Sequence, residues 1–171
     1  MRHFAIPIVA ALLACSLYAT SHNPYPNEIK GLELYDLYLK PLIPGKSDTA
    51  QAVQVLGKNG NLKLKDWEIR ALYSCAEDFL TCSQGPRNDL LATIEVTPKH
   101  RVSLRRFKFP TVFSHSDGSV SEINVTCDVY ADEFGLEYWV VSEDFPSHSK
   151  GDLLMIRYGP KRATVKGRVQ N

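Results

Sequence analysis

The stretch Ile123–Val141, INVTCDVYADEFGLEYWVV, decides the fold because it predicts a β-hairpin. Apolar residues alternate with polar ones from Ile123 to Tyr130, and strand-forming residues return from Leu136 to Val141. The intervening residues end in Gly135, which can adopt the positive φ that a tight turn requires. The protein is therefore expected to contain an antiparallel sheet.

Further strand patterns lie on both sides of this hairpin. Alternation predicts strands at Leu62–Leu64, Trp67–Cys75, Leu90–Thr97 and Leu153–Tyr158. In Arg101–Phe109 the alternation changes phase at Arg105-Arg106, so we expect a bulge there, or a break between two short pieces.

A short helix is predicted between Pro44 and Gly57. Ser47 or Asp48 can accept hydrogen bonds from the first free amides, and Gln51 lies in capping-box register with Asp48. Gly57 is a typical helix stop. Ala52, Val53 and Leu56 then share one face, which can pack on a sheet.

The segment Glu28–Leu42 is rich in Leu and Tyr but fits neither a regular helix nor a regular strand, so its conformation stays open, with a short helix favoured. Tyr138 and Trp139 are adjacent on a predicted strand and must face opposite sides. Trp139 is expected in the core, and if both faces are buried, Glu28–Leu42 is the expected cover.

Together these patterns predict an α+β fold: an antiparallel sheet of about five strands with one or two short N-terminal helices packed on one face. The expected division is a leader at residues 1–21, a proline-containing tether at 22–27, a single domain at 28–160 and a disordered basic tail at 161–171.

Part of this pattern resembles a known class. Gly45-Lys46-Ser47, the helix ending in Val55-Leu56-Gly57 and the aromatic-led strand at Trp67 resemble the helix-to-sheet entry of small outer-membrane lipoproteins of the barrel-assembly-machinery class. The resemblance covers about Gly45–Cys75, with Leu153–Tyr158 as a final strand, and implies a helical part packed on a short antiparallel sheet. The chain after its leader is also similar to exported proteins of environmental bacteria such as acidobacteria, which implies export and no particular activity.

Met1–Ser21 is predicted to be an export leader. Its apolar run, Phe4–Ala14, is too short to cross a bilayer, which needs about 20 apolar residues. Cleavage after Ser21 is the favoured interpretation. In the alternative, residues 1–14 form a lipoprotein signal and Cys15 becomes the lipidated first residue, the only membrane attachment we predict. The expected location is the periplasm, the outer envelope or the extracellular space.

Export makes the remaining cysteines disulfide candidates. The favoured pair is Cys75 with Cys82. The alternative joins Cys75 to Cys127, because each lies on the apolar face of a predicted strand and should point toward the core, and an unbridged chain also remains open.

No catalytic, cofactor-binding or metal-binding residues are predicted. His115 and Asp117 lie among serines, but no G-x-S-x-G element accompanies them, and Asp117-Gly118 is interpreted as a turn in a solvated loop. No metal-binding motif is present, and the acidic residues near Asp128, Asp132 and Glu133 are interpreted as a solvated hairpin end.

The net charge of +1 and the hydrophobic share of 44% are those of an ordinary globular domain and do not indicate nucleic-acid binding. One basic cluster stands out, and its structural interpretation is the cationic outer face of a strand pair. Its functional interpretation is a surface facing anionic lipid or polysaccharide, with Arg101, Arg105, Arg106 and Lys108 as candidates.

We therefore expect an exported, non-enzymatic binding or structural component of the cell envelope or extracellular space, with a protein or envelope partner of unknown identity. A secreted protein-interaction or inhibitor module is the alternative, and a small secreted hydrolase is third.

Overall fold

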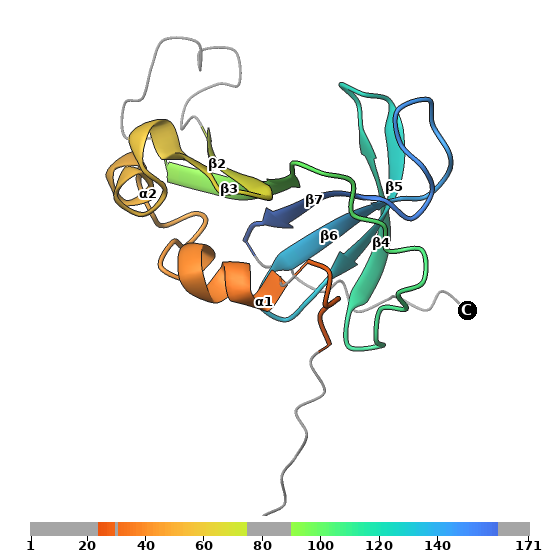
Figure 1. Ribbon diagram of the computed structural model, residues 1–171. Coiled ribbons are helices and arrows are strands. Elements are labelled where there is room, and N and C mark those ends of the chain that lie inside the picture. The colour runs from red at the N-terminus through yellow and green to blue at the C-terminus, as the bar shows by residue number, and fades with distance from the viewer. Residues whose placement is uncertain (1–23, 30, 75–89, 161–171) are drawn as a thin grey trace, which may run out of the picture.

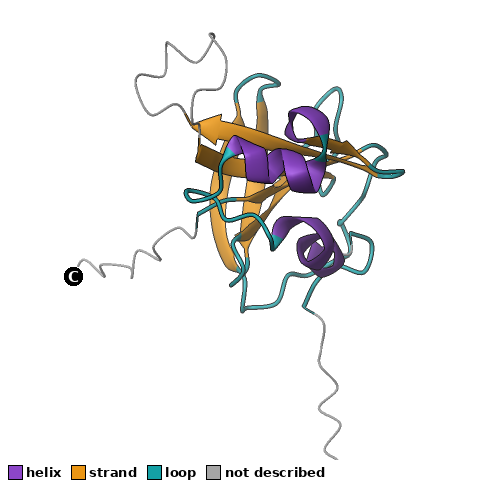
Figure 2. Cartoon of the chain, turned by 90° about the vertical axis from the view of Figure 1, so that its left-hand side faces the viewer, coloured by secondary structure: helices purple, strands orange, loops and turns teal. Residues whose placement is uncertain are grey.

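The computed structural model describes residues 24–29, 31–74 and 90–160. It contains one open antiparallel sheet of seven strands in the order β1-β2-β3-β7-β6-β5-β4, with two short α-helices on one side (Figures 1 and 2). The helical elements are α1 (Gly31–Leu34), a π-helical turn (Tyr35–Leu39), α2 (Thr49–Leu56) and a 3₁₀ turn (Lys58–Gly60). The strands are β1 (Asn61–Lys63), β2 (Trp67–Ser74), β3 (Leu90–Pro98), β4 (Ser114–Val120), β5 (Val125–Ala131), β6 (Leu136–Val141) and β7 (Leu153–Tyr158).

Helix α2 forms as its sequence predicts. The Asp48 side chain accepts a hydrogen bond from Gln51 N at 2.9 Å, and the Gln51 side chain accepts one from Asp48 N at 3.0 Å. This reciprocal capping box confirms the predicted start, and Gly57 ends the helix at φ 87°. Ala52 and Leu56 are buried in the core, whereas Val53 is 37% exposed, so the buried face is narrower than expected.

Helix α1 and the following π-helical turn place the N-terminal Leu and Tyr side chains on the sheet. Gly31 lies directly over Tyr138, and a Cβ at Gly31 would be 2.1 Å from the Tyr138 hydroxyl oxygen. This position therefore requires glycine, because only a hydrogen side chain leaves room for the Tyr138 ring beneath it.

The predicted β5–β6 hairpin is confirmed, with Gly135 at φ 89°. The expectation of about five strands is wrong, since the sheet has seven. The last strand, β7, lies between β3 and β6 and pairs antiparallel with both.

Strand β4 corrects the interpretation of Asp117-Gly118 as a turn. Asp117 pairs with Asp128, and Gly118 pairs with Cys127, in the middle of the β4–β5 ladder. The turn comes later, at residues 121–124, and a Cβ at Gly118 would lie 2.8 Å from the Trp139 ring. An exposed edge strand needs few apolar side chains, which explains why its alternation was not visible in the sequence.

The segment 101–113 contains no strand of the sheet, which corrects the predicted strand pieces. Only Ser103 forms an isolated bridge, with Asp152. The predicted break is present, because Phe107 N donates to Leu104 O at 2.9 Å and closes a turn at Arg105-Arg106.

The core lies on both faces of β6, all six residues of which are buried. Tyr138 belongs to the large cluster under the helices, and Trp139 to a smaller cluster on the opposite face with Cys127, Val129 and Met155. The opposite orientation and the burial of Trp139 are confirmed. The N-terminal segment, however, covers Tyr138 and not Trp139.

Candidate functional site

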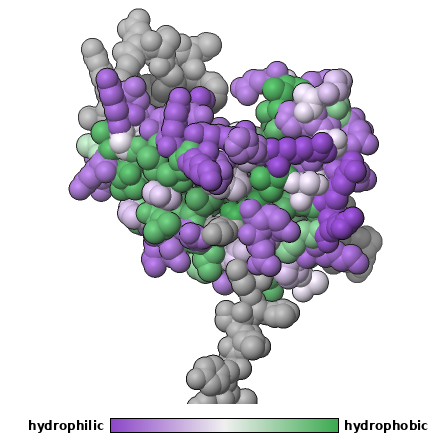
Figure 3. Space-filling view, in the orientation of Figure 1, coloured by the Kyte–Doolittle hydropathy of each residue, from purple (hydrophilic) through white to green (hydrophobic). Residues whose placement is uncertain are grey.

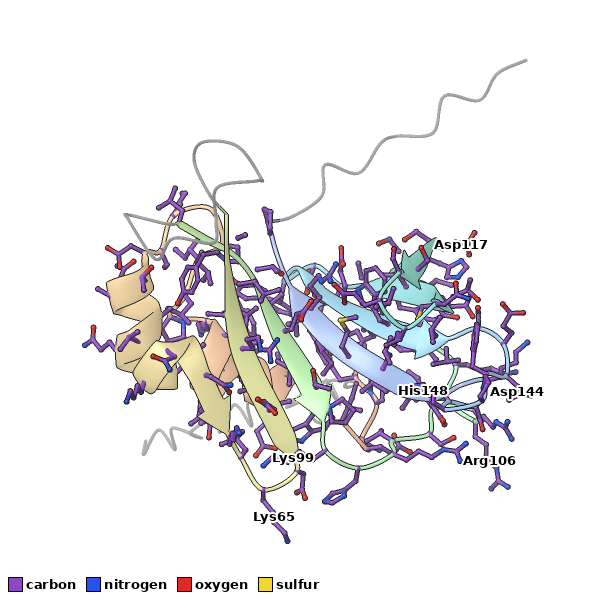
Figure 4. The ribbon with its side chains drawn as sticks, turned by 90° about the horizontal axis from the view of Figure 1, so that it is seen from above. Lys65, Lys99, Arg106, Asp117, Asp144 and His148 are labelled. Carbon is purple, nitrogen blue, oxygen red and sulfur yellow. The ribbon has the colours of Figure 1, made fainter. Side chains whose placement is uncertain are left out.

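A pocket of about 400 Å³ lies between β5, β6 and the loops at residues 104–109 and 144–151; we call it the strand-end pocket. Figure 4 shows that Asp117, Asp144, Arg106 and His148 gather at the end of the sheet that points away from α2. The pocket is lined by Leu104, Arg105, Phe107, Phe109, Asp128, Tyr130, Val140, Val141, Asp144, Lys150 and Gly151.

Backbone hydrogen bonds hold the two loops of the pocket together. Leu104 N donates to Gly151 O at 2.6 Å, and Leu153 N donates to Val102 O at 2.8 Å. Gly151 has φ 84°, and a Cβ there would lie 2.6 Å from Cγ of Arg105. The approach of the loops therefore requires glycine at this position.

Aromatic rings form the floor of the strand-end pocket. Phe107 and Phe109 meet edge to face at 5.0 Å between ring centroids, and Phe109 stacks on Tyr130 at 4.0 Å. The imidazole ring of His115 also lies near Tyr130, with 5.0 Å between the two ring centroids. Burial, followed by the charge of Asp128, raises the pKa of Tyr130 above its usual value.

The rim of the pocket carries charges of both signs. Arg105 Nε donates to Lys150 O at 2.7 Å, and Arg105 Nη2 lies 3.4 Å from Asp144 Oδ1. The same Asp144 oxygen accepts a hydrogen bond from Lys150 N at 2.8 Å. Lys150 is exposed, and its ammonium forms no ion pair within the described part of the chain.

The four predicted anion-facing residues divide into two kinds. Arg101 is paired with the buried carboxylate of Asp152 at 2.9 Å, and Arg105 is paired with Asp144. Arg106 and Lys108 are exposed and have no ion pair among the residues that the structure describes. The cationic character that remains at this end therefore comes from Arg106, Lys108 and Lys150.

The β4–β5 register brings the remaining polar candidates to the edge of the pocket. His115 and Asp117 are two residues apart on β4 and so share one face, and Asp128 on β5 lies opposite Asp117. His115 Nε2 is 3.2 Å from Asp128 Oδ1. The structure thus unites His115, Asp117, Asp128 and Arg105, which the sequence had placed in three separate hypotheses.

The other two histidines of the described ranges, His100 and His148, line a second cavity of about 410 Å³. His148 Nδ1 lies 2.8 Å from the hydroxyl of Ser147, and His100 lines the same cavity. The carboxylate of Asp152, which also lines this cavity, accepts hydrogen bonds from Arg101 Nε and from Ser149 N. Among the described residues, His115 forms no hydrogen bond with a serine, which leaves the hydrolase hypothesis without a serine–histidine–carboxylate arrangement.

A third concavity of about 490 Å³ lies beside the N-terminal segment. Pro24, Pro110, Val112 and Phe134 give it an apolar surface, and Val112 is 73% exposed. We call it the proline groove. Asp132 and Glu133 make one side of it acidic.

Several predictions fall outside the described residues. The leader with Cys15, the tail at 161–171 and both cysteines of the favoured disulfide, Cys75 and Cys82, lie there. Cys127 is described and buried and forms no disulfide within the described residues, and burial raises its pKa to about 11. Cys127 lies on β5, and three strands of the sheet separate β5 from β2, the strand that ends just before residue 75. Both disulfide pairings stay predictions.

Sequence reasoning did not identify the aromatic floor or Lys150 as parts of a site. Phe107, Phe109 and Tyr130 look like ordinary core residues in the sequence, and Lys150 stands alone in a polar loop. The repeated Phe-x-Phe after Arg105-Arg106 was the only local signal, and it was interpreted as one face of a strand.

No helix in the described ranges is long and apolar enough to span a membrane. No protein-family model matches the chain, and neither curated proteins nor solved structures provide a match. The resemblance to envelope lipoproteins therefore stays a prediction.

Proposed function

We propose that the protein is an exported, non-catalytic binding domain that takes an amphipathic anion in the strand-end pocket. Export is supported by the predicted leader at Met1–Ser21. The ligand class is supported by one observation: aromatic and aliphatic side chains line one pocket together with Lys150, whose ammonium group has no ion pair in the described chain.

The chemistry of the pocket favours this class over a purely polar ligand. The rings of Phe107 and Phe109 and the side chains of Leu104 and Val140 offer apolar contact to a hydrocarbon or ring. Arg105 is held in place by Asp144, so its charge is largely balanced, whereas Lys150 can pair with a sulfonate, carboxylate or phosphate.

The test uses 8-anilinonaphthalene-1-sulfonate as a small amphipathic anion. The wild-type protein should bind it saturably at one site, with affinity that falls as salt rises. Lys150→Gln should weaken binding about two- to fivefold, the range for an exposed ion pair. Phe107→Ala should weaken it through loss of the floor.

Lys65→Gln is the matched control, because Figure 4 shows Lys65 on a turn remote from the pocket. Cooperative thermal unfolding of each variant excludes dye binding to a partly folded state. Equal loss of affinity in the Lys65 and Lys150 variants, or no binding by the wild type, would refute the proposal.

The same ligand chemistry can come from a soluble amphiphile or from a lipid surface, and vesicles separate the two sources. Binding to phosphatidylglycerol vesicles should require Arg106 and Lys108, which have no ion pairs in the described chain and lie on the loop bordering the pocket. The double variant Arg106→Ala/Lys108→Ala should lose salt-sensitive retention on vesicles and keep the affinity for the dye. If the double variant is retained on vesicles as well as the wild type, the two cations do not bind a lipid surface, and a soluble amphiphile is the favoured ligand.

A protein-interaction module is the second candidate, and the proline groove is the observation that favours it. Its exposed apolar residues and its acidic side fit an apolar segment with a basic flank. On the face seen in Figure 3, hydrophobic residues are interspersed with hydrophilic ones. Val112→Asp should abolish such an interaction in a pull-down from the native host without changing dye binding.

A further inference from the structure

The sheet edge beside the strand-end pocket brings three potential metal ligands together. His115 and Asp117 come from β4, Asp128 comes from β5, and all three side chains lie on the same face of the ladder. One ligand atom from each residue lies within 4.8 Å of the other two. Neither their sequence separation nor any local motif indicates this grouping.

The spacing is close to that of a metal centre. Ligand atoms bound tetrahedrally to Zn²⁺ lie about 3.3–3.5 Å apart, as follows from bond lengths of about 2.0–2.2 Å. The existing 3.2 Å contact between His115 Nε2 and Asp128 Oδ1 already matches this distance. The ligand atom of Asp117 lies within 4.8 Å of the other two.

The charges at the cluster are unbalanced without a cation. Two carboxylates lie directly opposite each other across an antiparallel ladder, which is destabilising. The one ion-pair partner of Asp128 within the described chain is His115, and Asp117 has none there. The His115–Asp128 contact at 3.2 Å is therefore the one side-chain contact of this kind at the cluster within the described chain, and Asp117 has no cationic partner there.

The imidazole is held in position by packing. Its ring lies against Tyr130, which in turn stacks on Phe109 with an interplanar angle of 7°. Side chains whose orientation is set in this way lose little freedom when they bind a metal. His115 is 51% exposed and Asp128 33% exposed, so an ion can reach them from solvent.

We infer that His115, Asp117 and Asp128 bind a divalent transition-metal cation of the Zn²⁺ class. The imidazole nitrogen favours such an ion over Ca²⁺ or Mg²⁺, which prefer oxygen ligands alone. Three protein ligands leave a fourth position for water or for a donor atom of a ligand. Because Asp128 also lines the strand-end pocket, a metal here would border that site, yet its binding does not depend on the proposed amphipathic ligand.

The first experiment titrates ZnCl₂ into chelator-treated protein and follows binding by calorimetry. One equivalent should bind at this site. Loss of groups that merely orient a metal ligand costs about 10–100-fold in affinity, so His115→Ala, Asp117→Asn and Asp128→Asn should each weaken binding by more than about tenfold. His100→Ala and Asp36→Asn, which remove an imidazole and a carboxylate elsewhere, should leave it unchanged.

The second experiment uses the opposite effects of Asp117 with and without metal. In chelator, Asp117→Asn should raise the Tm, because it removes the repulsion between facing carboxylates. In excess Zn²⁺ the wild type should gain more Tm than the variant, because the variant binds the ion more weakly. An equal Zn²⁺-induced rise in the Tm of the wild type and of Asp117→Asn would overturn the inference. So would a loss of Zn²⁺ affinity in His100→Ala or Asp36→Asn as large as that in the site variants. A rise in the Tm of the wild type with Ca²⁺ but not with Zn²⁺ would also overturn it.

Discussion

Tyr138 shows how a single side chain determines its surroundings. Its ring is fully buried under the N-terminal helices, and its hydroxyl has no hydrogen-bond partner among the described residues. Burial, followed by the nearby charge of Asp132, raises its pKa far above the usual value. Gly31 is the residue that accommodates this hydroxyl.

Gly31→Ala should destabilise the protein by about 1–3 kcal/mol, because the new methyl group would overlap the Tyr138 hydroxyl. Tyr138→Phe should be nearly neutral or slightly stabilising, since it removes a buried hydroxyl without a partner. The double variant should recover part of the loss. Urea unfolding of the four proteins measures this coupling, and strictly additive effects would contradict it.

At the scale of an element, the conformation of strand β4 depends on its neighbours in the fold. It is a polar edge strand, and its position is determined by pairing with β5 and by Gly118 packing against Trp139. His115 and Asp117 on this strand supply two of the three proposed metal ligands, and the third, Asp128 on β5, also lines the strand-end pocket. An edge strand can be this polar because one of its faces meets solvent.

Helix α2 is the opposite case, because its ends are determined locally. Asp48→Ala should cost about 0.5–2 kcal/mol through loss of the N-cap hydrogen bond. Gln54→Ala, at an exposed position on the same helix, should change the stability little. Thermal unfolding monitored by circular dichroism tests both; equal effects would show that the cap is not what stabilises the helix start.

At the scale of the whole molecule, a hydrogen bond ties the N-terminal segment to the β5–β6 turn. The Tyr25 hydroxyl donates to Asp132 Oδ2 at 2.7 Å across 107 residues of sequence. Asp132 also accepts from Phe134 N and Leu136 N, and so organises the turn. Burial raises the pKa of Asp132, whereas these hydrogen bonds lower it and only partly offset burial.

The raised pKa has a defined consequence for stability. The folded state holds the Asp132 proton more tightly than the unfolded state, so stability from this group falls as pH rises through the unfolded and then the folded pKa. Tyr25→Phe removes a bond to the carboxylate and should raise the folded pKa further. We expect a loss of about 1.5–3 kcal/mol at pH 7 and a smaller loss at pH 3.

Urea unfolding at both pH values, with NMR titration of the Asp132 carboxyl, tests this expectation. Tyr38→Phe is the control, because no described hydrogen bond involves the Tyr38 hydroxyl. A loss for Tyr25→Phe that is the same at pH 3 and pH 7 would exclude the proposed linkage.

The sequence by itself determined the features that depend on near neighbours in the chain. These are the capping box and stop of α2, the β5–β6 hairpin, the α+β class and the opposite orientation of Tyr138 and Trp139. Each follows from contacts within about four residues or from the twofold period of a strand.

Only the tertiary structure decided the order of the strands and the composition of the candidate sites. Strand β7 lies between β3 and β6 and joins the two parts of the sheet, and no local pattern specifies pairing between strands so distant in the sequence. The Ser-rich residues 114–120 form a strand because they pair with β5 and because Gly118 packs against the Trp139 ring. That pairing brings Asp117 opposite Asp128, since a cross-strand neighbour is specified by register and not by distance along the sequence.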